Sequence, residues 1–195
     1  MAPLDSLSCA LFLVGSFVLA GIAQTIWLGS RCSRRLAVPI DFGRTLRGKR
    51  IFGDNKTPRG FVVMVPATAL AFALFHHLLG AIDSSWVDGI WPLTDAEYLA
   101  LGALAGLGFM LGELPNSFVK RQLGIPPGHA ARGGFARTLS FVFDRLDSIL
   151  GALLAQSLVV PTPWKMWTLV LLIGPVVHGL FSVALFWLRV KPRWA

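Results

Sequence analysis

The sequence predicts an all-α membrane protein with five transmembrane helices, its N-terminus outside and its C-terminus in the cytoplasm. Three observations support this prediction: the composition, five apolar stretches and the distribution of basic residues. Of the 195 residues, 54% are hydrophobic and 14% are charged, and the mean hydropathy is +0.64. Soluble domains carry about 25% charged residues, so a soluble enzyme is excluded. The high hydrophobicity also excludes a disordered chain.

Five stretches have the length of about 20 residues that a helix needs to cross the bilayer core. They lie at about 7–29, 60–82, 98–119, 141–160 and 166–188, and together they form a single transmembrane domain, 1–195. Three of them contain no Asp, Glu, Lys or Arg. The third contains Glu113, and the fourth contains Asp144, Arg145 and Asp147. These two stretches are therefore the least apolar, and they contain the side chains best suited to a functional site.

Basic residues gather in alternate connecting segments. Nine lie in 31–59, five in 120–145 and three after residue 188, which leaves Lys165 alone on the other side. Because Lys and Arg are retained on the cytoplasmic side, we expect cytoplasmic loops at about 30–59 and 120–140. The net charge of +8 then comes from these cytoplasmic loops and favours an anionic ligand. We expect no nucleic acid as a partner.

The third stretch contains two glycine pairs, Gly102 with Gly106 and Gly108 with Gly112, each spaced by four residues. On a helix the two pairs fall on different faces, so we expect a central helix with close neighbours on two sides. The alternative is that the glycines reflect only the general abundance of small residues in membrane helices.

The first cytoplasmic loop combines glycines at 43, 48, 53 and 60 with interleaved Arg and Lys. Glycine lets the backbone approach a ligand closely, and exposed N–H groups, a lysine and a helix N-terminus together favour polyphosphate. Asp54 and Asn55 separate Gly53 from Lys56, so the loop is not a Walker A motif. The alternative is a loop that only anchors the topology. The candidate nucleotide- or phosphate-binding residues here are Arg44, Arg47, Gly53, Asp54, Asn55, Lys56 and Thr57.

Charged residues also gather near the inner ends of the third and fourth stretches. Three- and four-residue spacings place each set on one side of a helix: Glu113, Ser117, Lys120 and Arg121 form one set, and Asp144 and Asp147 the other. Clustered carboxylates without thiolates favour a hard cation such as Mg²⁺. Acids and cations on one face therefore indicate a metal–polyphosphate complex. The alternative is that ion pairs only hold the helices together.

The four histidines divide into two groups. His129 follows Pro127-Gly128 in the second cytoplasmic loop, beside the carboxylates, and is a candidate for the same site. His76, His77 and His178 lie within apolar stretches, where we expect them to pack or to lie at the membrane interface.

These motifs resemble one family. The segment 39–60, then Ser117-Phe118-Val119-Lys120-Arg121, Pro127-Gly128-His129 and Asp144-Arg145-Leu146-Asp147, are similar to CDP-archaeol synthase. They resemble more distantly CDP-diglyceride synthetase, the phosphatidate cytidylyltransferase. The motifs occur in order and on the predicted cytoplasmic side, and the resemblance covers nearly the whole chain.

The resemblance implies a Mg²⁺-dependent transferase that moves CMP from CTP onto a lipid phosphate and releases pyrophosphate in phospholipid biosynthesis. It implies an inner or plasma membrane location with a cytoplasmic active site. The glycine-spaced helix and the resemblance both suggest a homodimer. The implied catalytic residues are Lys120, Arg121, Asp144 and Asp147, the implied metal ligands are Asp144, Asp147 and Glu113, and Ser117 and His129 join the phosphate-binding set.

Other functions stay open at this point. A transporter for an anionic solute needs polar groups at mid-membrane depth, whereas the ionisable residues here gather at one interface. A membrane scaffold subunit without catalysis is a further alternative. A CDP-alcohol transferase motif is broken after its second Asp by Ser148. The sequence does not distinguish an isoprenoid from an acyl acceptor lipid.

Overall fold

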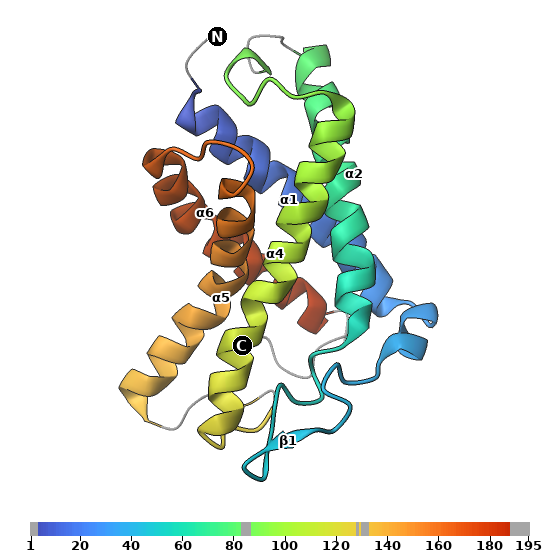
Figure 1. Ribbon diagram of the computed structural model, residues 1–195, viewed down its shortest axis with the longest axis vertical. Helices are drawn as coiled ribbons and strands as arrows, with labels where there is room; N and C mark the ends of the chain where they lie inside the picture. Colours follow the sequence, from blue (N-terminus) through green and yellow to red (C-terminus); the bar gives the residue numbers. More distant parts are fainter. Residues whose placement is uncertain (1–3, 83–86, 128, 130–132, 188–195) are drawn as a thin grey trace.

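The computed structural model describes residues 4–82, 87–127, 129 and 133–187. Its five long helices form one bundle, in which successive helices run in opposite directions (Figure 1). They are α1 (Ser6–Gly29), α2 (Pro58–Ile82), α4 (Asp95–Gln122), α5 (Gly134–Ser157) and α6 (Trp164–Trp187). Between α1 and α2 lie a short 3₁₀ helix, η1 (Cys32–Leu36), and a hairpin of two strands, β1 (Thr45–Leu46) and β2 (Lys49–Arg50). The prediction of an all-helical architecture is confirmed apart from this small hairpin.

Four of the helices are long and apolar enough to cross a membrane. They are α1, α2, α4 and the part of α6 over Trp164–Ala184. The fourth predicted span, 141–160, corresponds to α5, which begins earlier, at Gly134, and ends at Ser157. This helix carries three charged residues in its middle, so it lacks the apolar window of the other four. An integral membrane protein is confirmed, whereas a fifth span and the orientation of the termini stay predictions.

Capping side chains explain where two of the helices begin. The Asp5 carboxylate accepts a hydrogen bond of 2.7 Å from the Ser8 backbone N–H at the start of α1. A reciprocal capping box between Thr94 and Glu97 begins α4, and such a box satisfies two otherwise unpaired N–H groups. Helix α4 continues through Pro115 to Gln122. Glu113, Lys120 and Arg121 therefore lie on one continuous helix, as the sequence predicts.

Helix α4 lies between α2 and α5 (Figure 1). Gly102 and Gly106 face α2, where an added Cβ would lie 2.6 Å from the Thr68 carbonyl oxygen and 2.9 Å from the Thr68 hydroxyl, respectively. Gly108 and Gly112 face α5, where an added Cβ would collide with backbone atoms of Gly151 and Asp147. The expectation of a central helix with close neighbours on two faces is therefore met. Both glycine pairs therefore make contacts between helices of the same chain.

The α4–α5 contact predicts that adding a methyl group lowers the stability of the protein at Gly151 but not at Gly80, which lies outside this contact. In Gly151→Ala the new Cβ would collide with the Gly108 backbone, and we expect a loss of about 1–3 kcal/mol in unfolding free energy. The control Gly80→Ala places its Cβ 3.4 Å from Val87, an ordinary contact, so its stability should be unchanged or slightly higher. Thermal unfolding in detergent measures both. Equal midpoints for the two variants would contradict a backbone contact at Gly151.

Candidate active site

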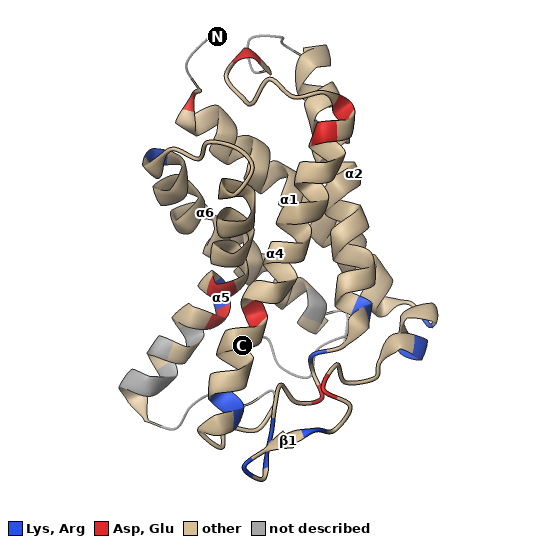
Figure 2. Ribbon diagram, viewed as in Figure 1, with Lys and Arg blue, Asp and Glu red and all other residues tan. Residues whose placement is uncertain are grey.

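Three segments bring opposite charges together in the half of the bundle that carries the first loop (Figure 2). Lys56, two residues before the start of α2, forms an ion pair with Glu113 on α4. Lys120, two turns further along α4, forms an ion pair with Asp144 on α5. The first of these pairs joins residues that are 57 positions apart in the chain. Ion pairs that link helices, one of the alternatives left open by the sequence, are present here.

Two neutral side chains complete this cluster. The Asn116 amide donates to Asp144 Oδ1 at 2.7 Å and to Asp147 Oδ2 at 2.8 Å. The buried Ser148 hydroxyl donates to Glu113 Oε1 at 3.0 Å. Neither residue is among the site residues predicted from the sequence. Asn116 was recognisable in principle, because it lies three residues after Glu113 and four before Lys120 and therefore shares their helix face.

Asp41 organises the first loop, a role that the sequence analysis also missed. Its carboxylate accepts backbone N–H bonds from Gly43, Phe52 and Gly53 at 2.9–3.1 Å, and it pairs with Arg50 at 2.6 Å. Burial by itself would raise the pKa of Asp41, but these donors hold it well below its usual range. Its stabilisation is therefore complete above the unfolded-state pKa of about 3.9 and is lost only as the pH falls through the lower folded-state value.

The organised loop is fastened to the end of α4. The Gln122 amide donates to the Arg50 carbonyl oxygen at 3.2 Å, and Lys49 donates to the Gln122 carbonyl oxygen. Gly53 has φ +89°, and an added Cβ would lie 2.9 Å from Pro127 and 3.2 Å from an Arg121 guanidinium nitrogen. A glycine is thus required both for the backbone conformation and for the close approach of the second loop.

Arg121 has the most enclosed guanidinium of the candidate residues. The side chain is on α4 next to Gly53, the residue is only 9% exposed, and its Nε is buried with no hydrogen-bond partner in the described part of the chain. A buried donor without an acceptor costs about 1–3 kcal/mol. An anionic ligand would supply the missing acceptor, so this position suits a phosphate group.

Other predicted residues lie at the edge of the cluster. Arg44, Arg47 and Asn55 are exposed, and Asp54 is exposed and pairs with Arg50. Thr57 is buried. Ser117 makes no side-chain hydrogen bond to any described residue, and His129 is exposed with its ring nitrogen 3.0 Å from the Pro127 carbonyl oxygen. The structure therefore brings together Lys56, Glu113, Lys120, Asp144 and Asp147, with Gly53 beside Arg121, and leaves the remaining residues around them.

The three carboxylates predicted as metal ligands are linked through Asn116 and Ser148. They do not converge on one point. Asp147 is half-buried and accepts only from neutral donors, with no ion pair to any described residue. A carboxylate in this state has capacity for a cation. The carboxylate oxygens of Asp147 and of the two neighbouring acids are the kind of ligand that a hard divalent ion prefers.

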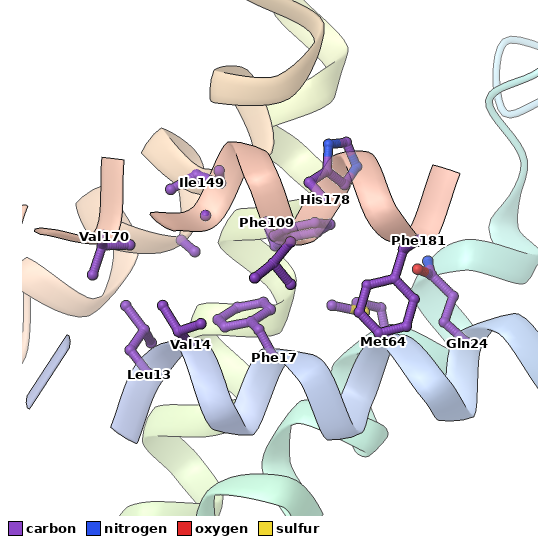
Figure 3. A pocket seen from close by; sticks show the side chains of 14 residues that line it. Leu13, Val14, Phe17, Gln24, Met64, Phe109, Ile149, Val170, His178 and Phe181 are labelled. Atoms are coloured by element: carbon purple, nitrogen blue, oxygen red, sulfur yellow. The ribbon is translucent and has the colours of Figure 1, made fainter. Parts of the chain in front are cut away.

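A separate apolar cavity lies deeper in the bundle, between α1 and α6 (Figure 3). Its volume is about 70 Å³, and its polar lining groups are Gln24 and His178. Phe109, which also lines it, contacts the His178 ring with 6.1 Å between centroids. Since Phe109 lies about one turn before Glu113 on α4, the cavity adjoins the charged cluster without sharing its residues. The other lining residues named in Figure 3 are Leu13, Val14, Phe17, Met64, Ile149, Val170 and Phe181.

Apolar membrane helices with acids and cations gathered at one end define an integral membrane enzyme that acts on phosphate groups. The family model described as CarS-like, CDP-archaeol synthase, matches residues 11–195. The CDP-archaeol synthase of Archaeoglobus fulgidus is 34% identical over 184 residues, which cover 87% of this chain and 96% of that protein. That of Thermofilum pendens is 36% identical over 155 residues, which cover 78% of this chain and 64% of that protein.

A solved structure, described as an intramembrane enzyme for archaeal membrane lipids biosynthesis, has the same fold. The TM-score is 0.60 at 23% identity, covering 93% of this chain and 97% of that chain. The chain belongs to the CDP-archaeol synthase family. The prediction of a lipid cytidylyltransferase is thereby confirmed at the level of the family, and the transporter and scaffold alternatives are not favoured.

The hydrogen bonds of Asp41 predict that its loss disorders the first loop. In Asp41→Ala three N–H groups and Arg50 lose their shared acceptor, at a cost of about 2–3 kcal/mol. Tryptic cleavage at the exposed Arg47 and Lys49 should therefore be at least about tenfold faster. The control Asp54→Asn removes only the exposed pair with Arg50, worth about 0–1 kcal/mol. Equal cleavage rates in the two variants would contradict the role of Asp41.

Proposed function

We propose that the protein transfers CMP from CTP to the phosphate of a membrane lipid at this charged end of the bundle. The products are a CDP-activated lipid of the CDP-archaeol or CDP-diacylglycerol type and pyrophosphate. The observation that carries the proposal is the convergence of Lys56, Lys120 and Arg121 with Glu113, Asp144 and Asp147 from three separate segments. Acids alone would suit a cation and bases alone an anion, whereas both together suit a metal–nucleotide complex.

We assign phosphate binding to the cations of the cluster. Arg121 offers a buried, unsatisfied donor, and Gly53 lets the first loop approach it. Lys56 and Lys120 now neutralise carboxylates, and both become available to phosphate when another cation takes their place. Arg44, Arg47, Asp54, Asn55, Thr57, Ser117 and His129 surround these groups as the outer part of the nucleotide site.

We assign Mg²⁺ binding to Asp147, Asp144 and Glu113. The half-buried Asp147, which is bonded only to neutral donors, supports this assignment, and oxygen ligands are those that Mg²⁺ prefers. A bound Mg²⁺ would supply positive charge to the phosphates during transfer. Asn116 and Ser148 hold these carboxylates in their present positions.

The chemistry needs neither a base nor a protein nucleophile. A phosphate monoester has a second pKa near 6, so an oxygen of the lipid phosphate is already largely ionised at neutral pH. That oxygen forms a bond to the α-phosphorus of CTP, and the bond from the α-phosphorus to the β-bridging oxygen breaks, so pyrophosphate leaves with the electron pair. The barrier is repulsion between two anions, and fixed cations lower it by positioning and electrostatics.

We place this site on the cytoplasmic side of the membrane. The nine basic residues of 31–59, together with Lys120 and Arg121, lie at this end, and the positive-inside rule retains such residues in the cytoplasm. The N-terminus is then outside. A homodimer stays a prediction from the family resemblance, because both glycine pairs of α4 already face α2 and α5.

We place part of the acceptor's hydrocarbon chain in the apolar cavity. His178 lines the cavity, and its neighbour Gly179 lies beside Arg145. The cavity and the charged cluster therefore meet at this turn of α6. A lipid phosphate held by the cations would have its chain directed toward the cavity.

The reaction is tested with purified protein in detergent, labelled CTP and Mg²⁺, with phosphatidate and an archaeal-type isoprenoid ether phosphate as separate acceptors. Asp144→Ala and Asp147→Ala should each lower CMP transfer by at least about 100-fold, because each removes a proposed metal ligand. Their elution in size-exclusion chromatography should be unchanged. The control Asp88→Asn changes an exposed acid in the connection between α2 and α4, away from the charged cluster, and should retain full activity. Full transfer by either alanine variant would overturn the proposed metal ligands.

The cavity proposal is tested by two neighbouring valines of α6. Val177 lines the cavity, whereas Val176 is 64% exposed and points away from it. Val177→Phe should raise KM for the lipid acceptor several-fold and leave the Kd for CTP unchanged, because it fills apolar space only. Val176→Phe should change neither constant. An unchanged lipid KM in Val177→Phe would contradict occupation of the cavity by the acceptor.

A further inference from the structure

Three potential metal ligands meet at the end of the bundle opposite the candidate active site. His76 and His77 lie on α2, and Asp95 is the first residue of α4. His76 Nδ1 lies 3.5 Å from Asp95 Oδ1, and His77 Nε2 lies 3.2 Å from Asp95 Oδ2. One ligand atom from each residue can be chosen so that all three lie within 4.8 Å of one another. The sequence analysis expected only packing or interfacial roles for these histidines.

We propose that His76, His77 and Asp95 bind a divalent transition-metal ion of the Zn²⁺ type. In a tetrahedral zinc site the metal–ligand bonds are about 2.0–2.1 Å, so neighbouring ligand atoms are about 3.3 Å apart. The two His–Asp separations, 3.5 Å to Oδ1 and 3.2 Å to Oδ2, are close to this spacing, and each involves a different oxygen of the Asp95 carboxylate. Two imidazoles and one carboxylate form a ligand set that zinc enzymes use, and imidazole favours Zn²⁺ and its neighbours over Mg²⁺ and Ca²⁺.

The surrounding structure holds these ligands in place. The His76 ring stacks on Tyr98 with 4.4 Å between centroids and 25° between planes. Tyr98 is fully buried, and its hydroxyl donates to the Trp91 carbonyl oxygen at 2.6 Å. The Thr94–Glu97 capping box fixes the backbone at Asp95. Such second-layer contacts orient metal ligands and raise affinity.

The site is open enough to admit an ion. The side chains of His77 and Asp95 are 63% and 56% exposed, and that of His76 is 20% exposed. Water can therefore complete the coordination. A bound ion joins the C-terminal part of α2 to the first turn of α4. The site is about 24 Å along α2 from Gly60, at 1.5 Å per residue, so it is separate from the candidate active site.

The test uses the tag-free, full-length protein in detergent, with Co²⁺ as a spectroscopic probe for the Zn²⁺ site. Excess Mg²⁺ is present so that the carboxylates of the candidate active site do not bind Co²⁺. The wild type should bind one Co²⁺ with a visible absorption band, and Zn²⁺ should displace it. In His77→Ala and Asp95→Asn the Kd for Co²⁺ should rise by at least about tenfold.

Two controls distinguish this site from adventitious binding. Asp88→Asn removes an exposed acid outside the group and should bind Co²⁺ as the wild type does. Zn²⁺ should raise the thermal midpoint of the wild type and of Asp88→Asn, but not that of Asp95→Asn. Equal Co²⁺ affinity in all variants would overturn the proposal, as would a wild type that binds no Co²⁺. In either case the three side chains form only ion pairs.

Discussion

The close contact between the backbones of α4 and α5 determines where the charged groups of this protein lie. Gly108 and Gly112 on α4 meet Gly151 and the Asp147 backbone on α5 with no room for a Cβ. This approach brings the middle of α5 to the charged half of α4, so Asn116 can reach two aspartates on the neighbouring helix. With larger residues at these positions the helices could not approach so closely, and the carboxylates would lose these partners.

Charge compensation is the second constraint, because acids near the apolar core are costly unless they are paired. Lys56 and Lys120 each neutralise one carboxylate, and Asn116 with Ser148 solvates a third. Arg121 is held with an unsatisfied donor instead. The three carboxylates of the cluster therefore all have partners within the chain. Asp41 contributes indirectly, because it keeps the first loop folded against α4.

Helix α4 connects the two proposed sites, which differ in their chemistry. Its last turns carry oxygen and ammonium groups suited to Mg²⁺ and phosphate, whereas its first residue, Asp95, meets two imidazoles of α2. Glycine contacts along the middle of α4 keep α2 and α5 in register with it. The central helix therefore fixes the positions of the side chains at both of its ends.

The sequence by itself determined the membrane class, the apolar helices, the charge asymmetry and the motifs that indicate the family, because these depend on composition and on spacing within one segment. It also placed Glu113, Lys120, Asp144 and Asp147 on the correct helix faces. Only the tertiary structure decided that Asp41 is the centre of a loop, that Asn116 bridges two aspartates and that His76 and His77 meet Asp95. These contacts join residues brought together by folding, and the spacing of residues along one chain does not specify which distant side chains will become neighbours.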